Sequence, residues 1–540
     1  MSERIERPRT HRREAGNQQA TGASPADGST VANKGLAGGK IGTFSGAVLG
    51  ISCVAPGYTL TASIGLIVAS VATKTPAIFI AGFVPMFLTA YAYRELNRDA
   101  PDCGASFTWS TRAFGPYVGW MCGWGMVIAS IIVLSNLAAV AVEFLYLFLA
   151  RLLADPAIAD LPDDKTVNIA TTLVIVAAGA AIAYRGVSMT ERVQLVLVGF
   201  QMALLAAFVV LAFAHVVSGN APAHLEFSAG WFNPFSGLSS GAFVAGLTGS
   251  IFAFWGWDTC LTLGEESKNP AKTPGRAGLL CIGAILTTYL LVSVAAMMYA
   301  GTGDSGLGLG NPDTADNVFG ALAGPVMGRW GGILLFLAVL ASSIASLQTT
   351  FLPAARTMLA MGSYGAFPSS FARVHPKFRV PSRGAVVAGV ATSIFYVVTT
   401  IFSERTLYDT IAALGIMIRW YYGITAFACA WYFLRQALSS ARDFAVKFAF
   451  PVVGGLMLLV VFAISVQEST DPAYGSGAAI GGIGLVFYLA FGILALGAVL
   501  MLVMRASRPD FFTGATLPRS TASRGAEEQR NAVGARTPAE

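Results

Sequence analysis

The sequence predicts an all-helical integral membrane protein with about twelve transmembrane helices. Hydrophobic residues make up 55% of the 540-residue chain and charged residues only 12%, about half the charged share of a soluble domain. Between Ile41 and Met504, apolar runs of roughly 18 to 30 residues alternate with short polar joints, and about 20 apolar residues suffice for a helix to cross a bilayer. Lys and Arg gather in alternate joints, as the positive-inside rule requires.

Twelve apolar runs are expected to form helices. Their ranges are 43–72, 76–97, 114–151, 167–185, 191–217, 239–264, 276–301, 328–360, 384–403, 407–435, 445–467 and 480–504. The runs 114–151 and 328–360 are longer than a bilayer needs, so we expect these helices to tilt or to extend beyond it.

The distribution of positive charge predicts the orientation. With the N-terminus inside, the short inside joints hold 16 Lys and Arg and the outside joints hold five. This asymmetry predicts a multi-pass protein of the cytoplasmic membrane with both termini cytoplasmic. The net charge of +6 then reflects orientation, and we expect no nucleic-acid partner.

Three regions divide the chain. Residues 1–40 and 506–540 are polar and rich in Gly, Ser, Thr and Arg, a composition typical of disordered segments. We expect both to be disordered cytoplasmic tails that flank a transmembrane domain over residues 41–505.

Several enzyme classes lack their motifs here. The sequence contains no G-x-x-x-x-G-K-[ST] phosphate loop and no paired His or Cys spacing of a metal site. Its six cysteines form no C-x-x-C pair. We therefore expect no catalytic residues, no cofactor, no metal site and no disulfide framework, and we predict that the chain is not an enzyme.

Two of the predicted helices carry signs of a break near mid-membrane. Pro56-Gly57 interrupts the first run, and Gly256 lies between Trp255 and Trp257 in the sixth. Proline lacks an amide hydrogen and glycine tolerates unusual dihedrals, and paired broken helices are typical of secondary transporters. The alternative is that Pro56-Gly57 is a simple kink and Gly256 a packing contact.

Each break opens a set of five helices. The sets cover residues 41–218 and 239–436, and the helices within 444–505 are additional. This division predicts two repeats of five helices followed by two C-terminal helices.

Unwound backbone at mid-membrane has a chemical use when it lines a cavity. Helix N-termini favour a carboxylate and freed carbonyls accept hydrogen bonds from an ammonium group, so the breaks suit an amino acid. The candidate substrate-binding residues are Ser52, Cys53, Ala55, Pro56, Gly57, Phe254, Trp255, Gly256, Trp257 and Thr259.

Three ordered loops carry a family resemblance. They are the stretches from Pro101 to Pro116, from Glu265 to Ala277 with its Asn269-Pro270 step, and from Ala355 to Pro376. In their order and spacing they resemble the loops of the amino acid–polyamine–organocation permease superfamily, over about residues 41–504.

The resemblance implies a leucine-transporter-type fold, in which two inverted five-helix repeats give alternating access to a central site. It also implies an amino acid or a related amine as substrate. The chain departs from the family in its first break, where Ser52-Cys53-Val54 stands in place of a G-S-G-type sequence, so the backbone that binds a carboxylate is expected to differ in shape.

Ionisable residues inside the membrane are costly and are therefore candidates for coupling or gating. Asp258 follows the second break, where related permeases often carry a carboxylate linked to protons or to the substrate amine. Arg419 lies about 18 Å into its helix at 1.5 Å per residue, and we expect it to pair with Asp258 or Glu143, to gate the outer vestibule or to bind an anionic substrate side chain. Glu143, late in the third run, is a further candidate for coupling or gating, and a position at the outer interface is its alternative. The alternatives are a structural hydrogen bond for Asp258 and a snorkelling position for Arg419.

The coupling ion is predicted to be H⁺ or Na⁺. Ser342, Ser343 and Ser346 offer hydroxyls for a sodium ion, and helix packing is the alternative use of these serines. No lysine lies between Gln194 and Gln201, where some proton-coupled relatives have one. Symport with either ion and exchange all stay open.

Together these observations predict a secondary active transporter of amino acids that works by alternating access. A polyamine or organic-amine permease and a non-transporting nutrient sensor are the alternatives. The expected partners are a small-molecule substrate and the lipid bilayer. The sequence predicts neither the particular amino acid nor the oligomeric state.

Overall fold

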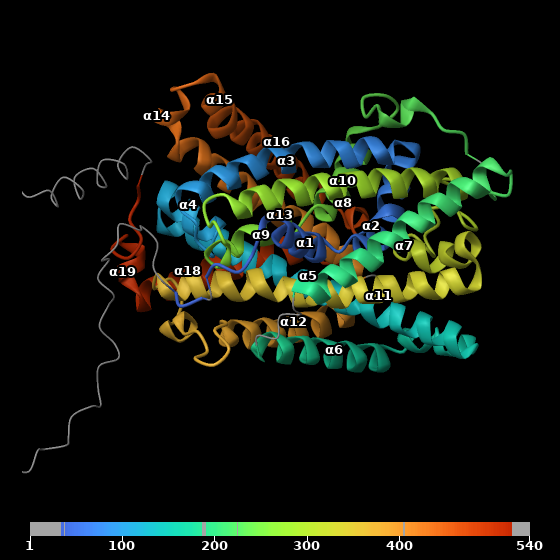
Figure 1. Cartoon of the computed structure of the whole chain (residues 1–540), viewed down its shortest axis with the longest axis horizontal. Coiled ribbons are helices and arrows are strands. Elements are labelled where there is room, and N and C mark those ends of the chain that lie inside the picture. The colour runs from blue at the N-terminus through green and yellow to red at the C-terminus, as the bar shows by residue number, and fades with distance from the viewer. Residues whose placement is uncertain (1–33, 37, 186–190, 224, 403–405, 521–540) are drawn as a thin grey trace, which may run out of the picture.

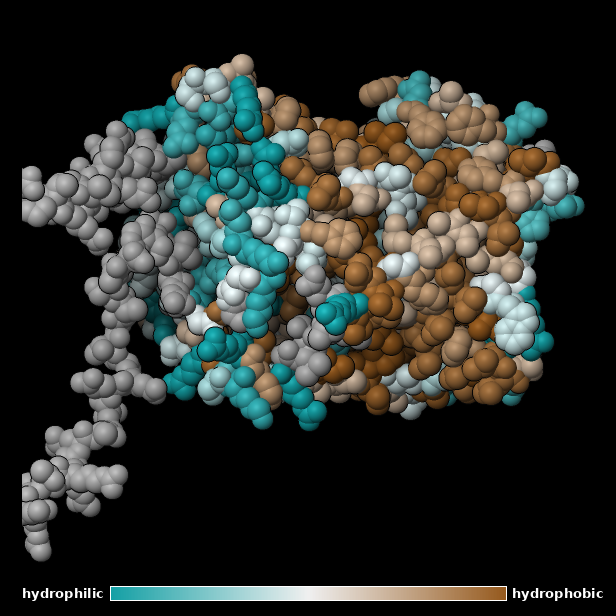
Figure 2. Space-filling view, in the orientation of Figure 1, coloured by the Kyte–Doolittle hydropathy of each residue, from teal (hydrophilic) through white to brown (hydrophobic). Residues whose placement is uncertain are grey.

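The computed structural model describes residues 34–36, 38–185, 191–223, 225–402 and 406–520. Long helices run nearly side by side along one direction, and the described regular structure is helical except for one short hairpin (Figure 1). The surface along the middle of the helices is largely hydrophobic, whereas hydrophilic residues gather toward one end (Figure 2). This distribution is the one expected for a protein embedded in a bilayer.

The helices follow one another in the order of the predicted runs. They are α1 (Thr43–Val54), α2 (Pro56–Val71), α3 (Thr75–Asp99), α4 (Ser106–Phe114), α5 (Pro116–Leu153), α6 (Lys165–Arg185), α7 (Glu191–Val217), α8 (Ser240–Ala253), α9 (Thr259–Thr262), α10 (Thr273–Ala300), α11 (Val318–Ser363), α12 (Ser382–Phe402), α13 (Thr406–Tyr432), α14 (Leu434–Ala437), α15 (Ala441–Phe444), α16 (Phe450–Glu468), α17 (Leu485–Phe487), α18 (Ile493–Ser507) and α19 (Pro509–Phe512). The hairpin pairs β1 (Ala479–Ile480) with β2 (Ile483–Gly484) in antiparallel fashion.

Membrane-spanning character agrees with the predicted class. Within the described part of the chain, ten stretches are long and apolar enough to cross a membrane by length and composition, and one of these joins α2 to α3. The shorter apolar helices α1 and α8 come in addition. The chain is therefore a multi-pass membrane protein, and twelve crossings stay a prediction.

The first break lies in the predicted segment, and the residue that interrupts the helix is Ala55, directly before Pro56. Ala55 has the left-handed φ of 51° and ends α1, and α2 begins at Pro56. Proline suits the first position of a helix, since its missing N–H would have no intrahelical partner there. The prediction of a broken first helix is confirmed.

The second break separates α8 from α9. Five residues, Phe254 to Asp258, form turns between the two helices, and Gly256 has a φ of +106°. Glycine adopts this conformation without the steric cost that a Cβ atom brings. The predicted break in the sixth helix is also confirmed.

The two broken helices lie against each other in opposite directions. The half before the first break, α1, packs beside α9, which follows the second break, and α2 packs on α8. Elements of the two five-helix sets thus meet in inverted order. The long helices α5 and α11 pack along each other through the bundle, while α16 and α18 lie outside on α13 and α5.

The tails predicted to be disordered fall mostly outside the described residues, namely over 1–33 and 521–540. The described part of each is packed: Lys34 is buried, and α19 buries Phe511. The predicted tails therefore reach too far into the chain. Short polar segments at the ends of a helical bundle can pack on it, and composition alone does not reveal this.

Candidate functional site

The backbones of the two breaks lie in direct contact. A Cβ atom added to Gly256 would come within 3.2 Å of the carbonyl carbon of Cys53 and of the nitrogen of Val54. A side chain here has to displace backbone, so the position requires glycine for space as well as for its φ of +106°. The breaks thus form one site at the meeting of the two repeats.

Cys53 is the centre of the polar contacts around this site. Its thiol accepts a hydrogen bond from the Thr259 hydroxyl at 3.0 Å and lies 3.5 Å from the hydroxyl of Thr350. Its carbonyl, freed by the break, accepts a hydrogen bond from Ser346 at 2.7 Å. Cys53 therefore ties the first break to α9 and to α11.

Aromatic rings surround the second break. The indole N–H of Trp255 donates to the hydroxyl of Tyr421 at 2.6 Å. The ring of Trp257 packs against Tyr93 at 5.2 Å and Tyr422 at 5.7 Å between centroids. All five rings are buried, so the site lies away from water and lipid.

Helix α7 supplies two side chains that the sequence did not single out as ligands. Gln194 accepts a hydrogen bond from the Ser52 hydroxyl at 2.6 Å, and Gln201 lies 3.5 Å from the amide of Gly57. Both glutamines are buried. Their spacing of seven residues on an apolar helix puts them on one face, and this is the signal that identifies them.

The predicted binding residues therefore gather in one place. Each is buried, and Ser52, Cys53, Gly57, Trp255 and Thr259 take part in the contacts above. Ala55 and Pro56 form the break itself, and Gly256 lies on Cys53. Phe254 turns away from this centre, with its ring 5.3 Å from that of Tyr289 on α10. That these residues bind a substrate stays a prediction.

Asp258 directly precedes α9 and is 1% exposed. Its carbonyl begins the short helix by accepting from the amide of Leu261 at 2.8 Å. The carboxylate lies near Tyr422, yet its Oδ2 atom has no hydrogen-bond partner of good geometry among the described residues. A buried carboxylate oxygen without a partner is costly, which is the expected condition of a group that exchanges a proton or meets a ligand.

The predicted pairing of Arg419 is wrong. Its guanidinium donates to the Ser465 hydroxyl on α16 and lies near Tyr474 and Glu468. The ion pairs among the described residues do not include one from Arg419 to either predicted carboxylate. The physical reason is the packing of α16 on α13, which the sequence does not specify.

Glu143 contacts Asn317 and not Arg419, and its predicted part in coupling or gating stays a prediction. Its carboxylate accepts a hydrogen bond from Asn317, whose side-chain oxygen accepts from the amide of Gly320 at 2.9 Å. Asn317 is thereby the N-cap of α11. Glu143 holds this cap in place and links α5 to the start of α11.

The three serines of α11 differ in their surroundings. Ser346 is already bonded to the Cys53 carbonyl. Ser342 lies against the first break, since a Cβ atom added to Gly57 would lie 3.3 Å from its hydroxyl oxygen. The hydroxyls of Ser342 and Ser343 have no hydrogen-bond partner among the described residues. Hydroxyl and carbonyl oxygens are ligands that suit a hard cation such as Na⁺, and a sodium site at these serines stays a prediction.

Comparison with known proteins agrees with this geometry. The family model described as "Amino acid permease" matches residues 41–496, which include both breaks. The methylthioribose transporter of Bacillus subtilis is 26% identical over 369 residues, covering 65% of this chain and 74% of that protein. The branched-chain amino acid permease BcaP of Lactococcus lactis is 28% identical over 338 residues, covering 59% and 67%.

A solved structure has the same fold. The crystal structure of MhsT in complex with L-phenylalanine matches this chain with a TM-score of 0.54 at 15% identity, covering 77% of this chain and 98% of that one. MhsT has the leucine-transporter-type fold, so the predicted fold class is confirmed. At this identity the similarity concerns the fold alone.

Proposed function

The chain belongs to the amino acid permease family of the amino acid–polyamine–organocation superfamily, and from this premise we propose that it carries an amino acid across the cytoplasmic membrane by alternating access. Membership of the family makes it a permease-type membrane transporter and not an enzyme. The substrate, the coupling ion, the membrane and the cytoplasmic position of both termini belong to the proposal.

The observation that carries the proposal is the contact between Gly256 and the backbone of Cys53. This contact brings two interrupted helices from opposite repeats together in a buried, polar site. Backbone groups freed in such a place have an energetic need for a polar partner. A zwitterion meets that need, because its carboxylate matches a helix N-terminus and its ammonium group matches a buried acceptor.

We assign the ammonium group of the substrate to the Asp258 carboxylate and its carboxylate to the amides at the start of α2. The rings of Trp255 and Trp257 then enclose the side chain. Arg419 is bonded toward Ser465 on α16, and this contact favours a substrate whose side chain carries no negative charge.

Two coupling ions compete. Proton coupling is supported by the unpartnered oxygen of Asp258, and sodium coupling by the unpartnered hydroxyl of Ser342 beside the first break. The replacements Asp258→Asn and Ser342→Ala separate the two. Loss of the pH dependence of uptake in the first variant supports H⁺, and loss of a Na⁺ requirement in the second supports Na⁺.

The decisive experiment is uptake into proteoliposomes. We expect saturable uptake and counterflow of an uncharged amino acid, measured over all amino acids with and without Na⁺ at several pH values. The screen includes polyamines and methylthioribose, since a relative carries the latter name. If only a polyamine or methylthioribose is taken up, that compound is the substrate and the amino acid assignment is wrong. Binding of a compound without counterflow supports a sensor.

A further inference from the structure

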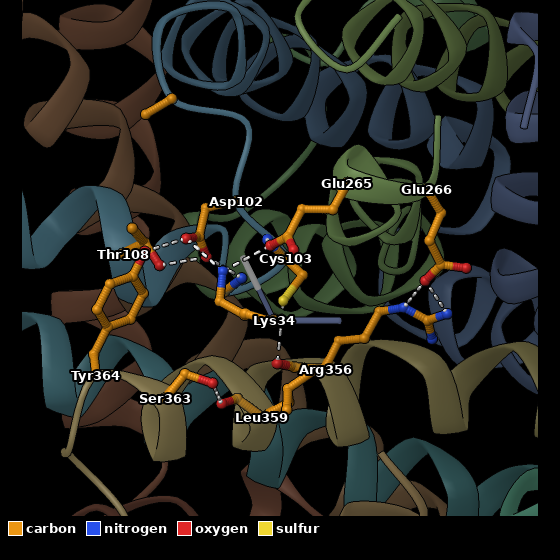
Figure 3. Close-up of polar contacts among 12 residues, drawn as sticks. Lys34, Asp102, Cys103, Thr108, Glu265, Glu266, Arg356, Leu359, Ser363 and Tyr364 are labelled. Carbon is orange, nitrogen blue, oxygen red and sulfur yellow. Dashed lines mark hydrogen bonds and ion pairs between the residues drawn. The ribbon is translucent and has the colours of Figure 1, made fainter. Parts of the chain in front are cut away.

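Lys34, a residue of the predicted N-terminal tail, is buried, and its side chain points toward Asp102 and Glu265 (Figure 3). Its ammonium group lies 2.8 Å from the Asp102 carboxylate and 2.7 Å from that of Glu265. The exposed fractions of the Lys34 and Asp102 side chains are both 0%. A charged group from a polar tail therefore occupies a site with no access to water.

The Asp102 carboxylate, which pairs with Lys34, is held by three further groups. Asp102 accepts further hydrogen bonds from the Tyr364 hydroxyl at 2.6 Å, the Thr108 hydroxyl at 2.9 Å and the amide of Gly104 at 2.7 Å. Burial opposes the ionisation of Asp102, but Lys34 and these hydrogen bonds lower its pKa below the usual range. The ion pair is thus stable while Lys34 is in place.

Lys34 joins the two repeats. Asp102 follows α3 in the first repeat, whereas Glu265 follows α9 in the second. The chain after Lys34 continues along the second repeat, where the amides of Lys40 and Ile41 donate to the carbonyl of Glu266 at 2.9 and 3.1 Å. Relative movement of the repeats at this end has to break these contacts.

The C-terminal segment over residues 509–520 meets the same place. The Thr516 hydroxyl donates to the carbonyl of Tyr364 at 2.6 Å, and the ring of Phe511 stacks on Phe107 at 5.7 Å. The Tyr364 ring in turn lies 5.2 Å from the Lys34 ammonium. Tyr364 therefore contacts both ends of the described chain.

The last described residues of the C-terminal segment lie along α4. The guanidinium of Arg519 donates to the Phe114 carbonyl at 2.5 Å, and the amide of Ser520 donates to the Arg112 carbonyl at 3.0 Å. Segments almost 500 residues apart in sequence thus cover one end of the bundle together. We call Lys34, Tyr364 and residues 509–520 the inner clasp.

We propose that the inner clasp is a regulatory lock, in which both tails together hold the two repeats closed at the inner end until Lys34 withdraws. The proposal rests on alternating access in the proposed function. Once Lys34 leaves, two carboxylates lie close together without a cation, an arrangement that is tolerable only when water enters. Release of the tail and hydration of the inner end are therefore one event.

Cys103 provides a built-in reporter. Its thiol is buried beneath the clasp, 3.7 Å from the carbonyl of Arg356. Cys281 is buried in α10, away from the clasp. Maleimide labelling of the folded, full-length protein in proteoliposomes, read at each cysteine by mass spectrometry, distinguishes opening of the clasp from general unfolding.

The matched variants are Lys34→Met and Lys40→Met. Both remove a lysine from the same segment, but Lys40 is exposed. We expect labelling of Cys103 to rise about tenfold or more in Lys34→Met, because breaking a buried ion pair leaves a charge uncompensated, while Cys281 and the Lys40→Met protein stay at the wild-type rate. Unchanged Cys103 labelling, or an equal rise at both cysteines, overturns the proposal.

Tyr364→Phe removes only the hydroxyl that donates to Asp102. This variant tests the proposed lock if Lys34→Met does not fold. We expect the labelling rate of Cys103 to rise less than in Lys34→Met, with Cys281 unchanged. An unchanged labelling rate of Cys103 contradicts the proposed lock. Combining Lys34→Met with Phe511→Ala tests whether the tails act together. If both tails form one lock, Cys103 in the double variant is labelled no faster than in the faster of the two single variants. If the two single-variant increases in labelling rate multiply, the C-terminal segment acts alone.

Failure of the proposed function gives a different result. Selective labelling without uptake of any substrate leaves the clasp in place and removes the transport proposal. Uptake by the wild-type protein, with labelling and uptake both unaffected in Lys34→Met, leaves transport in place and removes the clasp.

Discussion

Gly256 lies so close to Cys53 that a methyl group on it would come within 3.2 Å of the Cys53 carbonyl carbon. The two residues belong to different repeats and are separated by some 200 positions. Their contact converts two local irregularities into one site, because each break exposes polar backbone at the point where the other does. The function of the protein is therefore expected to depend on this contact.

Gly256→Ala tests the contact directly. Alanine at a left-handed φ is strained by about 1–2 kcal/mol, and here its methyl group also meets backbone. We expect the maximal uptake rate to fall at least about tenfold, since 1.4 kcal/mol corresponds to a factor of ten, in a protein that still folds. Gly283→Ala is the control, because a Cβ atom at Gly283 meets nothing within 4 Å. Equal activities of the two variants contradict the assignment.

Asp258→Asn removes a charge but keeps the shape of the side chain. Because the carboxylate is buried beside the second break, we expect loss of amine recognition or of ion coupling, seen as a flattened pH profile or as a Michaelis constant raised about tenfold or more. Asp304→Asn, in an exposed loop, is expected to behave as wild type. A wild-type pH profile together with wild-type affinity in Asp258→Asn removes this residue from the mechanism.

Ser465→Ala removes the Ser465 hydroxyl that accepts from the Arg419 guanidinium. An unsatisfied buried donor costs about 1–3 kcal/mol, so we expect a lower melting temperature in detergent. In an Arg419→Met background, Ser465→Ala leaves no buried charged donor without a partner. We therefore expect it to leave the melting temperature almost unchanged. A double-mutant cycle on thermal unfolding measures the difference, and additive effects argue against the pair.

The Lys34–Asp102 pair predicts a dependence of stability on pH. The pKa of Asp102 is lower in the folded protein than its ordinary value of 3.8, so its contribution is present above that value and is lost as the pH falls further. For Lys34 burial alone lowers the pKa, but the charge of Asp102 raises it overall above 10.5, so its contribution is present below 10.5.

The measurable quantity is the difference in melting temperature between wild type and Lys34→Met. We expect this difference to be constant between about pH 5 and 9 and to shrink below about pH 4. The Lys40→Met protein serves as the reference with no such difference. A gap that persists undiminished at pH 3 is inconsistent with an ionised pair.

The sequence determined the class of the protein because the signals for it are local. A run of apolar residues forms a helix in lipid whatever its neighbours are, and Pro56 and Gly256 alter the backbone through their own dihedral preferences. The helical membrane class and both breaks were therefore readable without a structure. The loop motifs placed the chain in its superfamily for the same reason.

Tertiary structure alone decided which side chains meet. Arg419 contacts Ser465 because α16 packs on that face of α13, and Lys34 is buried because Asp102 and Glu265 converge from different repeats. An apolar helix shows little preference for one lateral neighbour over another in lipid, since van der Waals packing and a few hydrogen bonds select its partners. The sequence by itself thus determined the helices and where they break, and only their packing decided the partners of each buried charge.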